Sequence, residues 1–215
     1  MRKAGVILYL ALFSCVSQSF AQEEKKSSIG FGIEEGAGYN TMHSTLVGDR
    51  DLFWIQPTVR IFYSFKLKDI SETTRLKMPV FIGYYTFGGV YNVITLIPED
   101  SLKRENLIFR SMEIGINPCL EIKNFQVGVL FKAQFIFSAI EKLYYEGFRK
   151  TMVENDVSKS YKNYSGNGGL KLRYKIKKFS LGTEAWFGLI NLYSNTSVGA
   201  KLTENNYRLL LGYEF

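Results

Sequence analysis

Two short pairs of residues carry the side chains that acyl-transfer chemistry needs. His43 is followed by Ser44, and Asp100 is followed by Ser101. A histidine that takes a proton from a serine hydroxyl, and is oriented by an aspartate, makes a nucleophilic triad. The evidence for a triad is limited to the residue types. Such pairs are common in polar segments, so their presence alone does not indicate an enzyme. We therefore expect the chain not to be an enzyme and keep catalysis as an alternative.

The composition excludes several other kinds of chemistry. The 215 residues include one His and two Cys, which excludes most zinc sites and any disulfide-rich scaffold. The formal charge of +7 invites a nucleic-acid partner. The basic residues form no stripe with interleaved aromatics, so we expect no nucleic-acid binding. We also expect no cofactor and no metal.

The first residues have the pattern of a secretory signal peptide. A basic start is followed by an apolar run over residues 4–16 and by small residues at Ser19 and Ala21. The apolar run is shorter than the ~20 residues of a membrane-spanning helix. We predict a signal peptide at residues 1–21 and one β-barrel domain at residues 22–215. Lipoprotein processing at Cys15 is the alternative, although Phe13 is bulky for it.

The rest of the chain alternates between apolar and polar residues. Aromatic residues make up 15% of the sequence, which suits β-strands. Eight segments show the alternation: 29–39, 53–65, 77–87, 108–122, 125–137, 166–176, 179–190 and 205–215. Several are longer than the five or six residues usual in soluble proteins, and a tilted strand needs about 9–11 residues to cross a bilayer. The pattern predicts an all-β fold, an eight-stranded antiparallel up-and-down transmembrane β-barrel.

The connections between these segments alternate in length. Those at 123–124 and 177–178 are very short, and 67–76 is a polar stretch of moderate length. The others are long: 40–52, 88–107, 138–163 and 191–204. Transmembrane barrels have short periplasmic turns and longer outer loops. Segment 138–163, the largest, is predicted to form a short amphipathic helix or to extend the barrel wall, and is a possible site for a protein partner.

The polar faces of the segments carry charges of both signs. An eight-stranded barrel has an interior that side chains fill, so inward charges must satisfy one another. We expect a luminal charge network that holds the barrel rigid rather than a conducting channel. Its members are Glu34, Arg60, Glu113, Glu121, Lys132, Lys171, Arg173, Lys175, Glu184, Arg208 and Glu214.

The row formed by Tyr207, Leu209, Leu211, Tyr213 and Phe215 resembles the C-terminal targeting signal of bacterial outer-membrane proteins. The alternating segments as a whole resemble the small eight-stranded OmpA/OmpX-type barrels. Residues 20–22 and 78–85 are also similar to the PorT-like barrels of Bacteroidota. These resemblances imply export to the bacterial outer membrane, assembly by the barrel assembly machinery, and contact with membrane lipid and lipopolysaccharide.

The function expected from these features is non-enzymatic. The barrel would have a structural role, a surface-interaction role, or an accessory role in an envelope or secretion complex, through its extracellular loops. One alternative is a lipid A acyltransferase or deacylase, since some barrels of this size have that activity and His43 would serve it. A second alternative is a soluble, lipocalin-like ligand-binding barrel in the periplasm, with its apolar rows inside.

Overall fold

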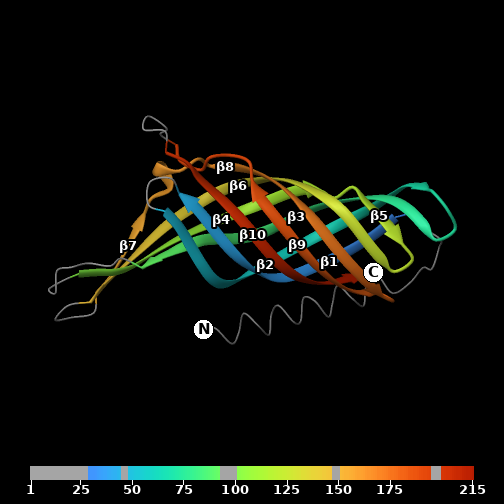
Figure 1. The fold of residues 1–215 in the computed structure, drawn as a ribbon, viewed down its shortest axis with the longest axis horizontal. Coiled ribbons are helices and arrows are strands. Elements are labelled where there is room, and N and C mark those ends of the chain that lie inside the picture. Colours follow the sequence, from blue (N-terminus) through green and yellow to red (C-terminus); the bar gives the residue numbers. More distant parts are fainter. Residues whose placement is uncertain (1–28, 45–47, 93–100, 147–150, 195–199) are drawn as a thin grey trace.

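The chain folds into a closed antiparallel β-barrel (Figure 1). The computed structural model describes residues 29–44, 48–92, 101–146, 151–194 and 200–215. The predicted signal peptide at residues 1–21 and Asp100 lie outside these residues. The strands are β1 (Ile29–Ser44), β2 (Gly48–Asp69), β3 (Thr74–Asn92), β4 (Ser101–Ile116), β5 (Cys119–Ile122), β6 (Phe125–Glu146), β7 (Thr151–Asp156), β8 (Tyr164–Ile176), β9 (Phe179–Gly188) and β10 (Leu202–Glu214).

Helix is nearly absent from the described part of the chain. It is limited to one 3-10 turn, η1, at Ser158–Ser160. No helix in the described ranges has the length and apolar character needed to span a membrane.

The barrel wall consists of eight strand positions, which we call staves. β1 is hydrogen-bonded to β2 on one side and to β10 on the other, which closes the sheet. β4 and β5 together form one stave, because both pair with β3 and with β6. The break between them falls at Asn117 and Pro118, where proline cannot donate to the ladder. The predicted eight-stranded antiparallel up-and-down barrel is confirmed.

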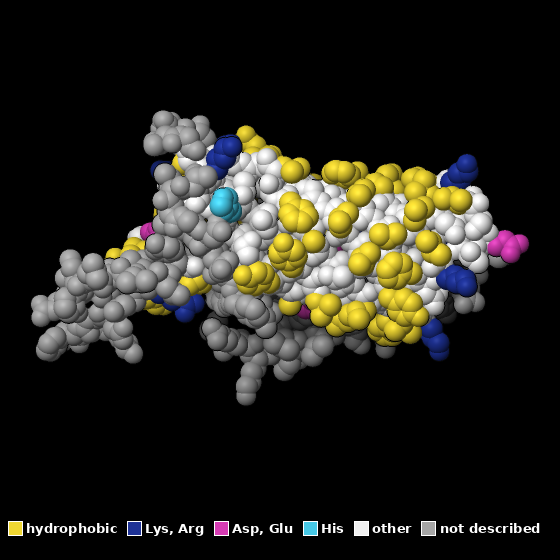
Figure 2. Space-filling view, viewed as in Figure 1, with side chains coloured by type: hydrophobic (Ala, Val, Ile, Leu, Met, Phe, Trp, Pro, Cys, Tyr) yellow, Lys and Arg dark blue, Asp and Glu magenta, His cyan; other side chains and the backbone are white. Residues whose placement is uncertain are grey.

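The apolar row of each stave faces outward. Phe131, Phe135 and Leu170 are each more than half exposed, whereas Lys132 and Gln134 between them are buried. Figure 2 shows apolar side chains scattered along the barrel wall with few charges among them. A lipocalin-like barrel would have the opposite arrangement, with apolar side chains inside. The structure therefore contradicts the lipocalin-like alternative.

The strands at one end extend well into the segments that the sequence predicted as loops. β1 and β2 continue over most of 40–52, and β6 runs to Glu146 before β7 returns beside it. The predicted amphipathic helix within 138–163 is wrong, and the alternative of an extended barrel wall is correct. Backbone pairing between neighbouring strands continues beyond the apolar band because it needs only a partner strand.

A β-bulge changes the face that β6 presents to the interior. Arg110 pairs with Ser138, but Ser111 pairs with Ile136, so Phe137 has no opposite residue. Beyond this bulge Ala139 is buried, although it lies in the same odd-numbered row as the exposed Phe135. The simple alternation of the sequence therefore ends at the bulge.

The interior has an apolar layer near the end with the long hairpins. Buried aromatic and aliphatic side chains fill it: Met42, Tyr85, Phe87, Leu107, Phe109, Ile136, Ala139, Leu192 and Leu202. Tyr161 and Tyr193 pack against the layer, and their backbones form a bridge that extends the pairing of β8 with β9 at the rim. The ring of Phe109 lies 5.0 Å from that of Tyr161. We call this layer the apolar plug.

Candidate functional site

Glu113 is the centre of a buried ion-pair network below the apolar plug. Its carboxylate accepts a hydrogen bond from Arg60 Nε. Lys132 Nζ lies 3.2 Å from Glu113 Oε2, and Arg208 Nη1 lies 3.3 Å from Oε1. All four side chains are fully buried. One acid thus joins cations from β2, β6 and β10, which are far apart in the sequence.

Glu184 and Glu34 extend this network around the lumen. Arg60 Nη1 donates to both carboxylate oxygens of Glu184, at 2.7 and 2.8 Å. Lys171 Nζ bridges the two acids, lying 2.7 Å from Glu34 Oε2 and 3.2 Å from Glu184 Oε1. Arg173 Nε lies 3.7 Å from Glu34. The structure brings eight of the eleven predicted luminal charges into one connected cluster, which we call the central network.

Aromatic rings line the same layer and contact the cations by their faces. Lys132 Nζ lies 4.6 Å from the ring centres of both Tyr85 and Trp186. The Arg208 guanidinium lies 3.8 Å above Tyr85. Trp186 also donates its indole N–H to Glu184, at 2.7 Å. These rings supply negative faces to cations that have left water, which favours their burial.

A polar layer that the sequence analysis missed joins the central network to the apolar plug. The Tyr85 hydroxyl lies 2.6 Å from Asn40 Oδ1 and 2.9 Å from Glu204 Oε1. Asn206 donates to Asn40 and to Tyr85. Glu204 and Asn206 lie in the same even-numbered row of β10 as Arg208, so extending that row would have identified them.

The other three predicted charges form a separate cluster at the turn end. Lys175 Nζ lies 3.4 Å from Glu121 Oε2 and also pairs with Glu214. Lys77 Nζ lies 2.9 Å from Glu121 Oε1. Lys77 is not among the predicted luminal charges. It lies on the inward row of β3, in the same odd-numbered row as the buried Phe81.

Of the triad residues that the sequence offered, the described side chains are those of His43 and Ser44, and the structure does not bring these two together. His43 is exposed and Ser44 is buried, because consecutive residues of a strand point to opposite faces. The Ser44 hydroxyl lies 3.4 Å from the Tyr193 hydroxyl, at the edge of the apolar plug. Ser44 is therefore placed for packing and hydrogen bonding rather than for attack by way of His43.

No group of three or more His, Cys, Asp or Glu residues within the described ranges could hold a metal ion. Cys119 is buried and forms no disulfide.

Beyond the barrel wall, the carboxyl group of Asp156 is stabilised in its ionised form by the first residue of η1. Ser158 hydrogen-bonds to Asp156 through its side chain and its backbone N–H, and this lowers the pKa of the Asp156 carboxyl.

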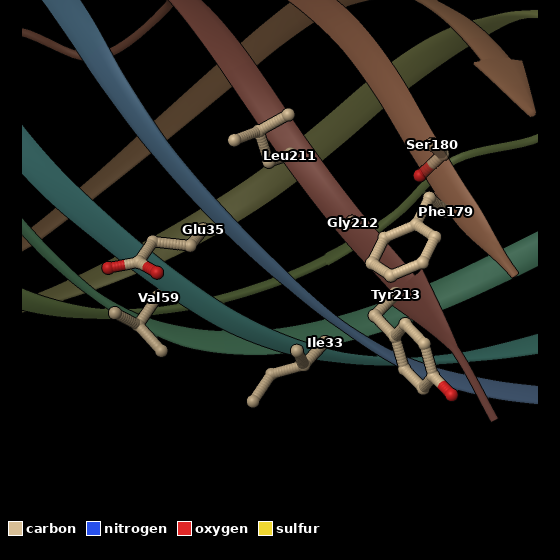
Figure 3. Close-up of a pocket in the computed structure, with 8 residues that line it drawn as sticks. All are labelled: Ile33, Glu35, Val59, Phe179, Ser180, Leu211, Gly212 and Tyr213. Atoms are coloured by element: carbon tan, nitrogen blue, oxygen red, sulfur yellow. The ribbon is translucent and has the colours of Figure 1, made fainter. Parts of the chain in front are cut away.

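A groove on the outer face of the barrel has one unusual lining residue (Figure 3). Its volume is about 260 Å³, and it is lined by Ile33, Glu35, Val59, Phe179, Ser180, Leu211, Gly212 and Tyr213. Glu35 points outward, and its cross-strand neighbours are Leu211 and Val59. The lining holds no second charged side chain, so the groove gives no evidence of a particular ligand.

The targeting row predicted on β10 also faces outward. Tyr207, Leu209 and Leu211 are exposed, and Leu211 is 66% exposed. At the turn end, Tyr213 lies 5.1 Å from Phe179, and Phe215 stacks on Phe31 at 5.5 Å between ring centres. The row is thus one apolar stripe that ends in an aromatic cluster.

Replacing Glu113 with Gln is expected to destabilise the barrel by about 3–5 kcal/mol, because three buried cations then lose their shared counter-charge. Unfolding of the refolded barrel by urea would measure the loss. Glu35→Gln is the matched control, since Glu35 is exposed and makes no ion pair with a described residue. Equal unfolding midpoints for the Glu113 variant and the wild type would contradict the central role of Glu113.

No protein-family model matches this chain, and no curated protein matches it significantly. Among solved structures it is similar to Ail, the attachment invasion locus protein of Yersinia pestis. That alignment has 10% identity and a TM-score of 0.47, and it covers 88% of this chain and 100% of Ail. Neisserial surface protein A aligns at 11% identity and a TM-score of 0.49, over 86% of this chain and 97% of its own. A major outer membrane protein from Thermus thermophilus aligns at 10% identity and a TM-score of 0.47, over 88% and 100%. The likeness concerns barrel architecture, and the role of this chain has to be argued from its own residues.

Proposed function

We propose that this chain is a non-enzymatic barrel of the bacterial outer membrane, which spans the bilayer and presents its long hairpins for interaction at the cell surface. The observation that carries the proposal is the inverted distribution of side chains. Charged side chains such as Glu113 and Arg60 are fully buried, whereas large apolar ones such as Phe135 and Leu211 are exposed. In water this distribution would be unfavourable, but in a lipid bilayer it is the expected one.

The lengths of the staves support the same position. The exposed apolar row of β6 runs from Phe125 to Phe137, and twelve residue steps at ~3.3 Å, tilted by about 40°, rise roughly 30 Å. The hydrocarbon core of a bilayer is about 30 Å thick. Closure of the barrel leaves no open sheet edge inside this band, as a lipid-exposed backbone requires.

A structural and binding role fits the interior better than conduction does. The central network and the apolar plug are both built of buried side chains in mutual contact. We infer that a lumen filled in this way conducts no solute and that its ion pairs hold the strands in register. Interaction would then fall to the parts of the barrel beyond the apolar band.

The β6–β7 hairpin is the part we propose for a protein partner. It extends past the barrel mouth (Figure 1). Among the described residues, β7 pairs with β6 alone, and its Met152 and Val153 are exposed. An unpaired strand edge can accept an extended peptide as an additional strand. This edge and these two side chains support the partner site predicted within 138–163.

Heat-modifiability of the membrane-bound protein tests the proposal directly. Unboiled protein from an outer-membrane fraction is expected to migrate differently from boiled protein on SDS gels, because a closed barrel resists SDS until it is heated. The matched sample is the soluble periplasmic fraction of the same cells. Protein found mainly in that soluble fraction, without a mobility shift, would overturn the membrane position.

The apolar row of β10 is proposed to serve as the signal read by the barrel assembly machinery. Phe215→Ala is expected to lower the amount of protein in the outer membrane several-fold. The folding stability of refolded protein should change little, because Phe215 is only partly buried. Tyr164→Ala, which removes an exposed aromatic from β8, is the control. Equal membrane levels of the Phe215 variant and the wild type would argue against the signal.

The non-enzymatic assignment is tested at the one histidine of the chain. His43→Ala is expected to leave the acylation pattern of lipid A unchanged, because His43 and Ser44 lie on opposite faces of β1. Mass spectrometry of lipid A from cells carrying either form measures this. Disappearance of one lipid A species in the variant would restore the enzyme alternative.

A further inference from the structure

Two tight turns at one end of the barrel hold lysine where glycine would be expected. Lys123 and Lys177 are the first residues of the two-residue turns that follow β5 and β8, and their φ angles are 53° and 55°. When the first residue of such a turn alone has positive φ, glycine is the favoured residue. Lys123 and Lys177 are the non-glycine residues of the described chain with this backbone geometry. The same residue type occupies this strained backbone position in both turns, which suggests that the lysine side chain has a function there.

The two turns also share their local sequence. One is Ile-Lys-Asn-Phe, ending at Phe125, and the other is Ile-Lys-Lys-Phe, ending at Phe179. Both phenylalanines are exposed on the outer face, at 43% and 64%. Each turn therefore places an ammonium group within one or two residues of the edge of the apolar surface. Figure 2 shows basic side chains at this end of the barrel, next to that surface.

The turns are neighbours in space. β6 pairs with β8 beginning at Phe125 and Tyr174, and the backbone N–H of Lys175 donates to Asn124 O at 2.8 Å. Lys123, Lys177 and Lys178 are all exposed. Lys175, by contrast, is partly buried and is neutralised by Glu121 and Glu214. The three exposed lysines, which we call the turn lysines, make no ion pair with a described acid.

We propose that the turn lysines bind the phosphate group of an anionic phospholipid in the leaflet around the turn end of the barrel. The proposal rests on the membrane position proposed above. A turn of two residues cannot extend an ammonium group far from the apolar band, so the charge lies at the level of lipid headgroups. The flanking phenylalanine rings lie where interfacial aromatics contact the region between headgroups and acyl chains. Binding of an acidic soluble protein would instead require basic side chains that project beyond the headgroups into the aqueous phase, and two-residue turns do not extend that far.

Native mass spectrometry of the full chain, folded in detergent, tests this binding. The barrel is titrated with phosphatidylglycerol or with phosphatidylcholine of the same acyl chains. The wild type is expected to retain phosphatidylglycerol preferentially. A variant with Lys123→Asn, Lys177→Asn and Lys178→Asn should lose at least about fivefold of this preference and should bind phosphatidylcholine unchanged. Asparagine tolerates positive φ, so the turns are expected to form in the variant.

Lys159→Asn is the matched control, because Lys159 is an exposed lysine in η1, which packs near the opposite mouth. Its preference should equal that of the wild type. The proposal is overturned if the triple variant keeps the preference, if Lys159→Asn loses it equally, or if soluble glycerol phosphate competes as well as the lipid does. The last result would assign the lysines to free phosphate groups.

Insertion separates this proposal from the one on which it depends. Each protein is first checked for a heat-dependent mobility shift after insertion into vesicles. An inserted barrel without any preference for phosphatidylglycerol would overturn the lipid site alone. A barrel that stays in the aqueous phase would overturn the membrane position as well.

Discussion

The structure depends on the need to pair charges inside a space that excludes water. An isolated ion in such a space carries a large desolvation penalty, which only close counter-charges and further hydrogen bonds can offset. Glu113 meets this need for Arg60, Lys132 and Arg208 together. The register of the barrel follows from the same need, because a slip of one residue would turn these charges outward and bury apolar side chains instead.

Aromatic side chains connect the ion-pair layer to the apolar plug above it. Tyr85 belongs to both, since its ring stacks on Phe87 at 5.5 Å while Arg208 and Lys132 contact it by cation–π interactions. The polar and apolar layers are therefore packed as one core. A core of this kind would support the long hairpins at the mouth, as the proposed binding role requires.

The sequence predicted the wall of the barrel well, because the side-chain alternation of a strand allows only two faces. It failed where that alternation is interrupted, at the bulge opposite Arg110 and at the ends of the strands. Most of the luminal charges could be identified by their position in a polar row. Their partners could not, because Arg60 and Glu184 are 124 residues apart and meet only when the barrel closes. Trp186 and Tyr85 were missed because an aromatic residue in an alternating strand fits either face, and only packing decides which one it takes.

The location of the surplus positive charge connects the interior to the membrane position. The chain has a formal charge of +7, yet acids and bases within the described lumen largely neutralise each other. The surplus must therefore lie mainly outside the lumen, and the turn lysines are part of it. Lys178 directly precedes Phe179, which packs with Tyr213 and Phe215 in one aromatic cluster. In the proposed position, the aromatic rings and the ammonium groups would fix the same depth of the barrel by independent means. The aromatic rings favour the membrane–water interface, and the ammonium groups of the turn lysines keep the turn end of the barrel out of the hydrocarbon core.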